Sequence, residues 1–219
     1  KQAEYDAFWD AYQENGNRRA YSYAFGGFGW TEATFKPKYD IVANETSYMF
    51  AGTRINIDLA ALLDELEIDL DFSGATSLSA TFNNTRFTRI GEIDASSATS
   101  LTSTFTTSTA LVTIKSLKVS ENTKASNAFA SCSSLENIEI KGTLGQNGFS
   151  WNTSTKLSHD SIVSIVNALS TTTTGLTVTL SKTAVNAAFE TSDGKKDGST
   201  SAEWLALVAT RPNWTIALA

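Results

Sequence analysis

The sequence predicts an α/β repeat solenoid built from units of roughly 23 residues, each with a short strand and a short helix. The main observation is internal similarity. Asp71–Phe82 (DFSGATSLSATF) is identical at 8 of 12 positions to Asp94–Phe105 (DASSATSLTSTF), which begins 23 positions later. A weaker copy, Lys118–Phe129 (KVSENTKASNAF), keeps a serine, a threonine and the final phenylalanine. Such a period is typical of solenoids, because one unit cannot bury its apolar face without its neighbours.

Each copy predicts a helical turn followed by a strand. An apolar residue precedes the phenylalanine by four positions, which is the spacing of one helical face. A polar turn follows, and then a short apolar run that in residues 135–140 reads L-x-x-I-x-I, the frame of a leucine-rich-repeat strand. We therefore expect irregular leucine-rich-repeat-like coils in which Phe82, Phe105 and Phe129 stack in one buried column.

Residues 70–141 resemble the BspA-like leucine-rich repeats of bacterial surface proteins, where a turn carrying an aromatic alternates with an L-x-x-I-x-I strand. The segments Tyr5–Arg18 and Ala209–Ile216 resemble sequences that frame such repeats in proteins of Gram-positive gut bacteria and their prophages. The resemblance implies adhesion or host-surface binding, and it attaches no catalytic residues to this chain.

The flanking regions are predicted to cap the repeats, so that three parts make one elongated domain. Residues 1–43 form an N-terminal aromatic capping region, in which Tyr5, Phe8, Trp9 and Tyr12 share one helical face. Residues 44–157 form the solenoid, with its clearest copies at 71–141. Residues 158–219 form a C-terminal helix–strand cap that covers the last coil.

Cap and alternation signals predict several further elements. Ser158 is expected to cap one helix, and Thr200 with Glu203 to form the capping box of another. The remaining expected elements are a helix at Leu59–Leu66 and strands at Ile68–Phe72, Leu176–Leu180 and Trp214–Leu218.

The amino-acid composition argues against several classes of partner and site. The net charge of −6 and isoelectric point near 4.8 argue against a nucleic-acid partner and an electrostatic membrane anchor. The chain has no apolar run of about 18 residues, so we expect no membrane insertion. One cysteine and one histidine are too few for a zinc site or an internal disulfide. Cys132 is expected to be a small buried hydrophobe. We predict no metal and no cofactor.

No residue set predicts catalysis. His159 lies between Ser158 and Asp160, but adjacent residues cannot converge as a catalytic triad does. The acidic pairs Asp69/Asp71 and Asp64/Glu65 fit solvated faces of a strand and a helix better than a glycosidase dyad. The chain is therefore predicted not to be an enzyme.

The sequence favours a non-catalytic binding or adhesion module that presents its surface to a protein or glycan on a host or cell surface. Trp151 and Asn152 are the predicted ligand-binding residues, because their loop interrupts the repeat rhythm and carries an unpaired aromatic. The alternative is a structural subunit of a larger assembly, such as a phage tail or surface appendage, with self-assembly through the N-terminal region. Both predict an extracellular, cell-surface or virion location.

Overall fold

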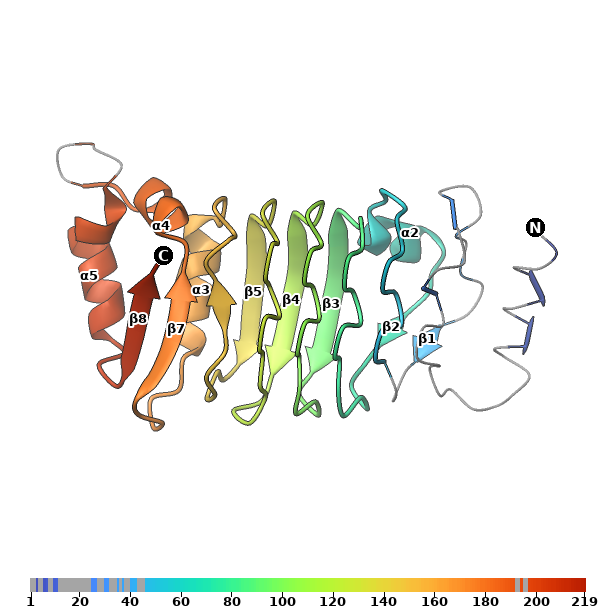
Figure 1. Ribbon diagram of the computed structural model, residues 1–219, viewed down its shortest axis with the longest axis horizontal. Helices are drawn as coiled ribbons and strands as arrows, with labels where there is room; N and C mark the ends of the chain where they lie inside the picture. Colours follow the sequence, from blue (N-terminus) through green and yellow to red (C-terminus); the bar gives the residue numbers. More distant parts are fainter. Residues whose placement is uncertain are drawn as a thin grey trace.

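In the computed structural model, the described residues form three short parallel sheets and four α-helices (Figure 1). The structure describes residues 46–191, 194 and 197–219, and before them residues 3, 6, 7, 10, 11, 25, 26, 30, 31, 35, 37 and 40–42. The predicted aromatic helical face at Tyr5–Tyr12 lies outside the described residues. The predicted domain boundaries stay a prediction.

The sheets follow one another along the long axis of the molecule. The first pairs β1 (Ile41–Val42) with β2 (Leu70–Asp71). The central sheet and the third sheet each have three strands in chain order. Their strands are β3 (Arg89–Ala95), β4 (Thr113–Val119), β5 (Asn137–Gly142), β6 (Ser150–Trp151), β7 (Leu176–Leu180) and β8 (Trp214–Leu218).

The predicted fold class, an α/β repeat solenoid with one strand and one helix in each unit, is wrong. The chain is a small α/β domain in which three separate parallel sheets are accompanied by helices. Within the described residues, the helices are α2 (Leu59–Glu65), α3 (His159–Ala168), α4 (Lys182–Ala188) and α5 (Ala202–Ala209), with a short 3-10 turn at Gly198–Thr200. Between α2 and α3, where the similar copies lie, the chain forms strands and turns and no α-helix.

Backbone conformation explains why the predicted helical turns do not form. Ala80, Ser103 and Asn127 have φ values of 55°, 57° and 56°, and a left-handed residue cannot continue a right-handed helix. The amides of these turns instead bond to the next segment of chain. Leu78 N donates to Ser100 O at 2.9 Å, and Leu101 N donates to Lys124 O at 2.7 Å. Leu78 and Phe82 are therefore four residues apart in a series of consecutive turns, and not on one face of a helix.

A column of stacked aromatic rings runs through the core. The prediction that Phe82, Phe105 and Phe129 stack and are buried is confirmed, because consecutive ring centroids lie 5.5 and 5.3 Å apart and all three residues are 0% exposed. The column continues at both ends: Phe50 stacks on Phe82 at 5.1 Å, and Trp151 stacks on Phe129 at 4.7 Å. Adding Phe25, which stacks on Phe50 at 4.8 Å, gives the six rings that we call the aromatic column.

The central sheet separates an apolar face from a charged face. Ile90, Ile114 and Ile138 lie opposite one another in register and are buried. The charged side chains of these strands lie on the opposite, solvent side, where they are exposed or partly exposed. They include Arg89, Glu92, Asp94, Lys115, Lys118, Glu139 and Lys141.

The flanking elements largely follow their predicted signals. Helix α2 begins after Asp58, which accepts a hydrogen bond from Ala61 N at 2.9 Å, and α3 begins after Ser158, as predicted. Strands β7 and β8 have the predicted bounds. The cap of α5 is Ser201 and not Thr200, and α4 was not predicted.

Cys132 is fully buried, which confirms its predicted place in the core. Its thiol donates to Phe105 O at 3.1 Å. Burial raises the pKa of this thiol to about 12, so the reactive thiolate form is scarce near neutral pH.

We predict that Phe105→Ala lowers the free energy of unfolding by about 3–5 kcal/mol, because it removes a buried ring from the middle of the aromatic column. Urea unfolding followed by circular dichroism measures the loss. Ser126→Ala, at an exposed position in the next turn, is the control and should stay within about 0.5 kcal/mol of the parent. A loss below about 1 kcal/mol for Phe105→Ala would show that the column does not hold the core.

Candidate functional site

The two predicted ligand-binding residues, Trp151 and Asn152, differ in their exposure to solvent. Trp151 is 0% exposed and stacks on Phe129 and on Phe149, whose ring centroid lies 5.9 Å away. Its indole nitrogen is also buried, with no hydrogen-bond partner among the described residues. A side chain this deep cannot contact a ligand without unpacking the core, so we remove Trp151 from the candidate site. The neighbouring Asn152 is exposed.

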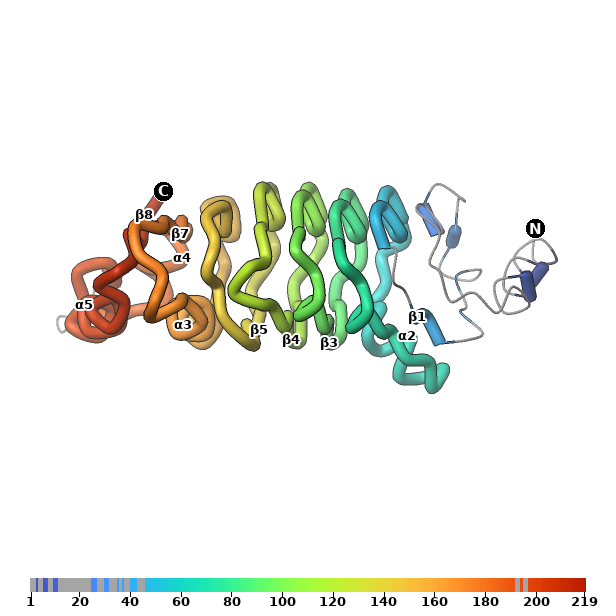
Figure 2. The backbone as a smooth tube through the Cα atoms, turned by 90° about the horizontal axis from the view of Figure 1, so that it is seen from below, coloured from blue at the N-terminus to red at the C-terminus, as the bar shows by residue number. Residues whose placement is uncertain are grey.

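Within the described part of the chain, a concave surface lies on the charged face of the central sheet. Helix α2 lies beside strand β3 and helix α3 beside strand β5, and both project from the same side of the molecule (Figure 2). Two surface hollows of about 310 and 320 Å³ lie where the sheet meets these helices. We call the surface formed by the outward face of β3–β5 and the two hollows the trough.

Side-chain hydrogen bonds hold α3 along the edge of the sheet. Ser161 Oγ accepts a hydrogen bond from Ile138 N at 2.9 Å, and Ser164 Oγ accepts one from Ile140 N at 2.8 Å. The two serines thereby satisfy amides that a further strand would otherwise bind. The hollow beside α3 is consequently rich in hydroxyl groups, with Thr113, Ser158 and Ser164 among its lining residues.

At the other end of the trough, an ion pair and a backbone hydrogen bond hold the start of helix α2 against strand β3. Arg89, the first residue of β3, donates to the carboxylate of Asp58, the N-cap of α2, at 2.9 Å. Thr88 N donates to Ile57 O at 2.8 Å just before the strand begins. The hollow beside α2 has an aliphatic floor that includes Leu63 and Ile68, with charged side chains at its rim.

Lys115 on β4 lies at the centre of the trough and lines both hollows. Its ammonium lies 3.0 Å from the carboxylate of Glu92 on β3. Lys141 on β5 lies 4.0 Å from the other oxygen of that carboxylate. The hydrogen bond from Lys115, and then the two positive charges, lower the pKa of Glu92 below its ordinary value. Both side chains of the closer pair are more than half exposed, so a bound partner can reach them.

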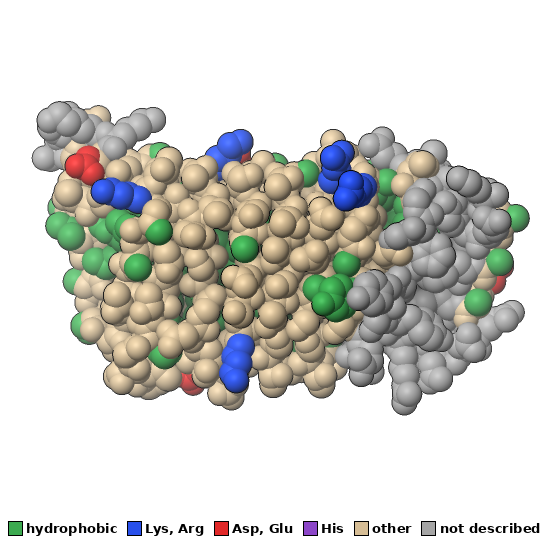
Figure 3. Space-filling model, viewed as in Figure 1, with side chains coloured by type: hydrophobic (Ala, Val, Ile, Leu, Met, Phe, Trp, Pro, Cys, Tyr) green, Lys and Arg blue, Asp and Glu red, His purple; other side chains and the backbone are tan. Residues whose placement is uncertain are grey.

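The face opposite the trough has a different character. In Figure 3 its surface is formed mainly by uncharged polar side chains and backbone. Hydroxyl groups on this side bond to one another, as Ser79 Oγ does to Ser100 Oγ at 3.1 Å and Ser100 Oγ to Thr102 Oγ1 at 2.9 Å. Several hydroxyl groups of this face are thus already hydrogen-bonded to one another. The trough, by contrast, combines hollows with exposed charged side chains.

His159, at the start of α3, lies between two carboxylates. Its Nδ1 is 3.1 Å from Asp160 Oδ1, and its Nε2 is 2.8 Å from Glu203 Oε1 on α5. The hydrogen bond to Asp160, followed by that to Glu203, raises the pKa of His159 above its ordinary value of 6.5. Its ring packs against Phe189 with centroids 4.8 Å apart. The contact with Glu203 links α3 to α5. The neighbouring Ser158 caps α3 and so is not placed as a nucleophile that His159 could activate.

The described residues form neither a metal site nor a membrane-spanning helix. Across the described ranges, no group of three or more His, Cys, Asp or Glu side chains is placed to hold a metal ion. None of the helices in those ranges combines the length and apolar character that a membrane crossing needs. No family model, curated protein or solved structure matches this chain at a significant level.

The trough was missed in the sequence because its parts are far apart in the chain. The prediction at Trp151 relied on the absence of a periodic partner, yet that indole occupies the next position of the aromatic column. The available signal was the outward charge on the predicted strands, where Glu92 and Lys115 fall in neighbouring copies. The two helical walls could not be placed from that signal.

We predict that Glu203→Gln lowers the pKa of His159 toward 6.5. A raised histidine pKa contributes stability that is fully present below the unfolded-state value and is lost as pH rises through the folded-state value. The difference in melting temperature between parent and variant should therefore be larger at about pH 5.5 than at about pH 9. A histidine NMR titration measures the pKa directly, with Glu65→Gln as the control that leaves it unchanged. An unaltered midpoint in Glu203→Gln would show that the bond to α5 is absent in solution.

Proposed function

We propose that the protein is a non-catalytic binding module and that the trough is its binding surface. The observation that carries this proposal is the position of Lys115, an exposed central side chain shared by two hollows of more than 300 Å³. A concave surface with a few convergent polar groups is the usual form of a binding site. The trough offers aliphatic contacts at one end, charges at its centre and hydroxyl groups at the other end.

The positions of the reactive side chains favour binding over catalysis. The chain has one histidine and one cysteine. Neither His159 nor Cys132 lines either hollow of the trough. The lysine and carboxylate at its centre already neutralise each other in an exposed ion pair, whereas a catalytic base or nucleophile needs a pKa tuned to its task.

The partner we propose is a protein or glycan on a host or cell surface, met outside the cell or on a virion. The acidic composition and the sequence resemblance of residues 70–141 to bacterial surface proteins support this setting.

A structural role in a larger assembly is the second candidate. It is favoured by the C-terminal end of the molecule, where Leu205 on α5 is 53% exposed close to the partly exposed Leu207 and Val208. Apolar side chains gathered at one end of an elongated domain suit contact with a neighbouring subunit. Concentration-dependent association that Leu205→Glu abolishes would favour this candidate.

We predict that Lys115→Glu weakens binding of the surface ligand at least about tenfold, equal to roughly 1.4 kcal/mol, because it reverses the charge shared by both hollows. The fluorescently labelled protein is first screened on arrays of glycans and of cell-surface protein domains, and dissociation constants are then measured for the hits.

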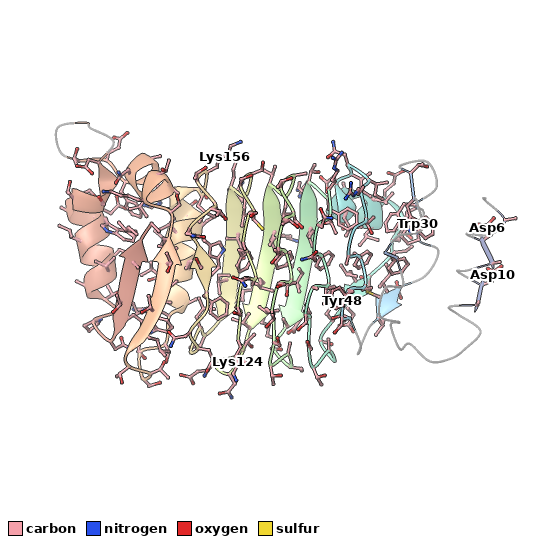
Figure 4. All side chains as sticks on the ribbon, in the orientation of Figure 1. Asp6, Asp10, Trp30, Tyr48, Lys124 and Lys156 are labelled. Atoms are coloured by element: carbon pink, nitrogen blue, oxygen red, sulfur yellow. The ribbon has the colours of Figure 1, made fainter. Side chains whose placement is uncertain are left out.

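Lys124→Glu is the matched control. Lys124 is exposed at the lower edge of the view in Figure 4 and lines neither hollow, so the same charge change there should alter binding less than about twofold. Equal losses in the two variants would place the binding surface outside the trough.

A further inference from the structure

We infer that the hollow beside α2 receives a lysine or arginine side chain from a basic protein partner. This inference rests on the proposed binding function of the trough and names the class of partner. It combines three observations on the described residues: the aliphatic floor of this hollow, the carboxylates at its rim that lack an ion pair, and a lining without an aromatic ring.

The floor of the hollow suits the hydrocarbon part of a long side chain. Ala60 and Leu63 of α2 are 8% and 6% exposed, and Ile68 and Leu70 are partly buried beside them. Gly91 of β3 completes the floor without a side chain, so the hollow stays open between the helix and the sheet. Lysine and arginine bury their methylene stems on such aliphatic surface and keep the charged group at the rim.

The rim supplies the opposite charge. Asp64 and Asp69 line the hollow and are exposed, and neither makes an ion pair within the described part of the chain. The other charges at the rim are already matched, since Arg89 pairs with Asp58 at 2.9 Å and Lys115 pairs with Glu92 at 3.0 Å. An incoming cation would therefore find two carboxylates that have not been neutralised.

The surrounding sequence strengthens this charge. Residues 58–71 contain six acidic residues and no lysine or arginine. The chain as a whole carries a net charge of −6. Complementary charge speeds the encounter of two proteins and orients them, so an acidic wall of this kind favours a basic partner.

The lining favours a protein over a glycan. None of the described residues that line the hollow is aromatic, and Phe72, Phe82 and Phe87 of the neighbouring segments are buried in the core. Sugar rings pack their C–H faces on exposed aromatic side chains, and an aliphatic floor offers no such platform. An aliphatic stem that ends in a cation fits both parts of the hollow.

The test uses the ¹⁵N-labelled protein and a capped peptide, acetyl-Ala-Lys-Ala-Lys-Ala-amide, in an NMR titration at low salt. We expect saturable shifts in the amides of residues 60–70 and 89–92. The paired change of Asp64→Asn with Asp69→Asn should raise the dissociation constant at least about fivefold. Glu190→Gln, which removes an exposed carboxylate that lines neither hollow, should change it less than about twofold.

A peptide with norleucine in place of lysine separates the two contributions, since it keeps the stem and loses the charge. It should bind more weakly than the lysine peptide to the parent and equally weakly to the parent and the paired variant. Lysine-peptide shifts that the paired variant does not reduce, or shifts confined to other surfaces, would overturn the inference.

The outcome is separable from that of the proposed function. If Lys115→Glu abolishes binding of a glycan hit while the lysine peptide leaves residues 60–70 unperturbed, the trough binds a ligand and the basic protein partner is wrong. If the peptide binds at α2 and Lys115→Glu affects no array hit, the hollow takes a cation and the trough is not the binding surface.

Discussion

Stacking of aromatic rings along the core is the interaction on which the rest of the structure depends. Six rings from Phe25 to Trp151 lie with neighbouring centroids between 4.7 and 5.5 Å apart. This spacing is close to the distance of about 4.8 Å between neighbouring strands, so the rings and the backbone ladder have the same period. Each stacked pair contributes about 0.5–1.5 kcal/mol beyond its burial. The positions of β3, β4 and β5, and hence of the trough, follow from this column.

Buried threonine hydroxyls complete the packing around the rings. Thr104 Oγ1 donates toward the carbonyls of Leu78 and Leu101 at 2.8 and 2.7 Å, and Thr123 Oγ1 donates to Ala98 O at 2.8 Å. All of these contacts lie in the interior, where an unsatisfied carbonyl is costly. Part of the threonine content of the chain therefore serves the turns of the core and is not available to a ligand.

Local signals in the sequence predicted much of the secondary structure. The strands predicted at Leu176–Leu180 and Trp214–Leu218 match β7 and β8. An apolar helical face predicted α2, the cap at Ser158 predicted the start of α3, and the shared phenylalanine predicted the ring stack. The helical turns were wrong because four-residue spacing does not distinguish a helix from consecutive turns, and left-handed residues such as Ser103 are not glycine. The reasoning at Trp151 did not foresee that its indole stacks on Phe129, because that partner is a neighbour in space and not in the sequence. The trough needs two helices more than 90 residues apart in sequence, which no local pattern reports.

The serines of α3 have a consequence for the behaviour of the protein in concentrated solution. The edge of a parallel sheet carries a row of amides that can pair with a strand from another molecule, which is a common start of fibril formation. At β5 the hydroxyls of Ser161 and Ser164 occupy two of these amides, and the helix covers the edge. A helix thus ends the central sheet where a foreign strand could otherwise join it. The two serines that line one end of the trough are therefore also expected to reduce strand-to-strand association between molecules.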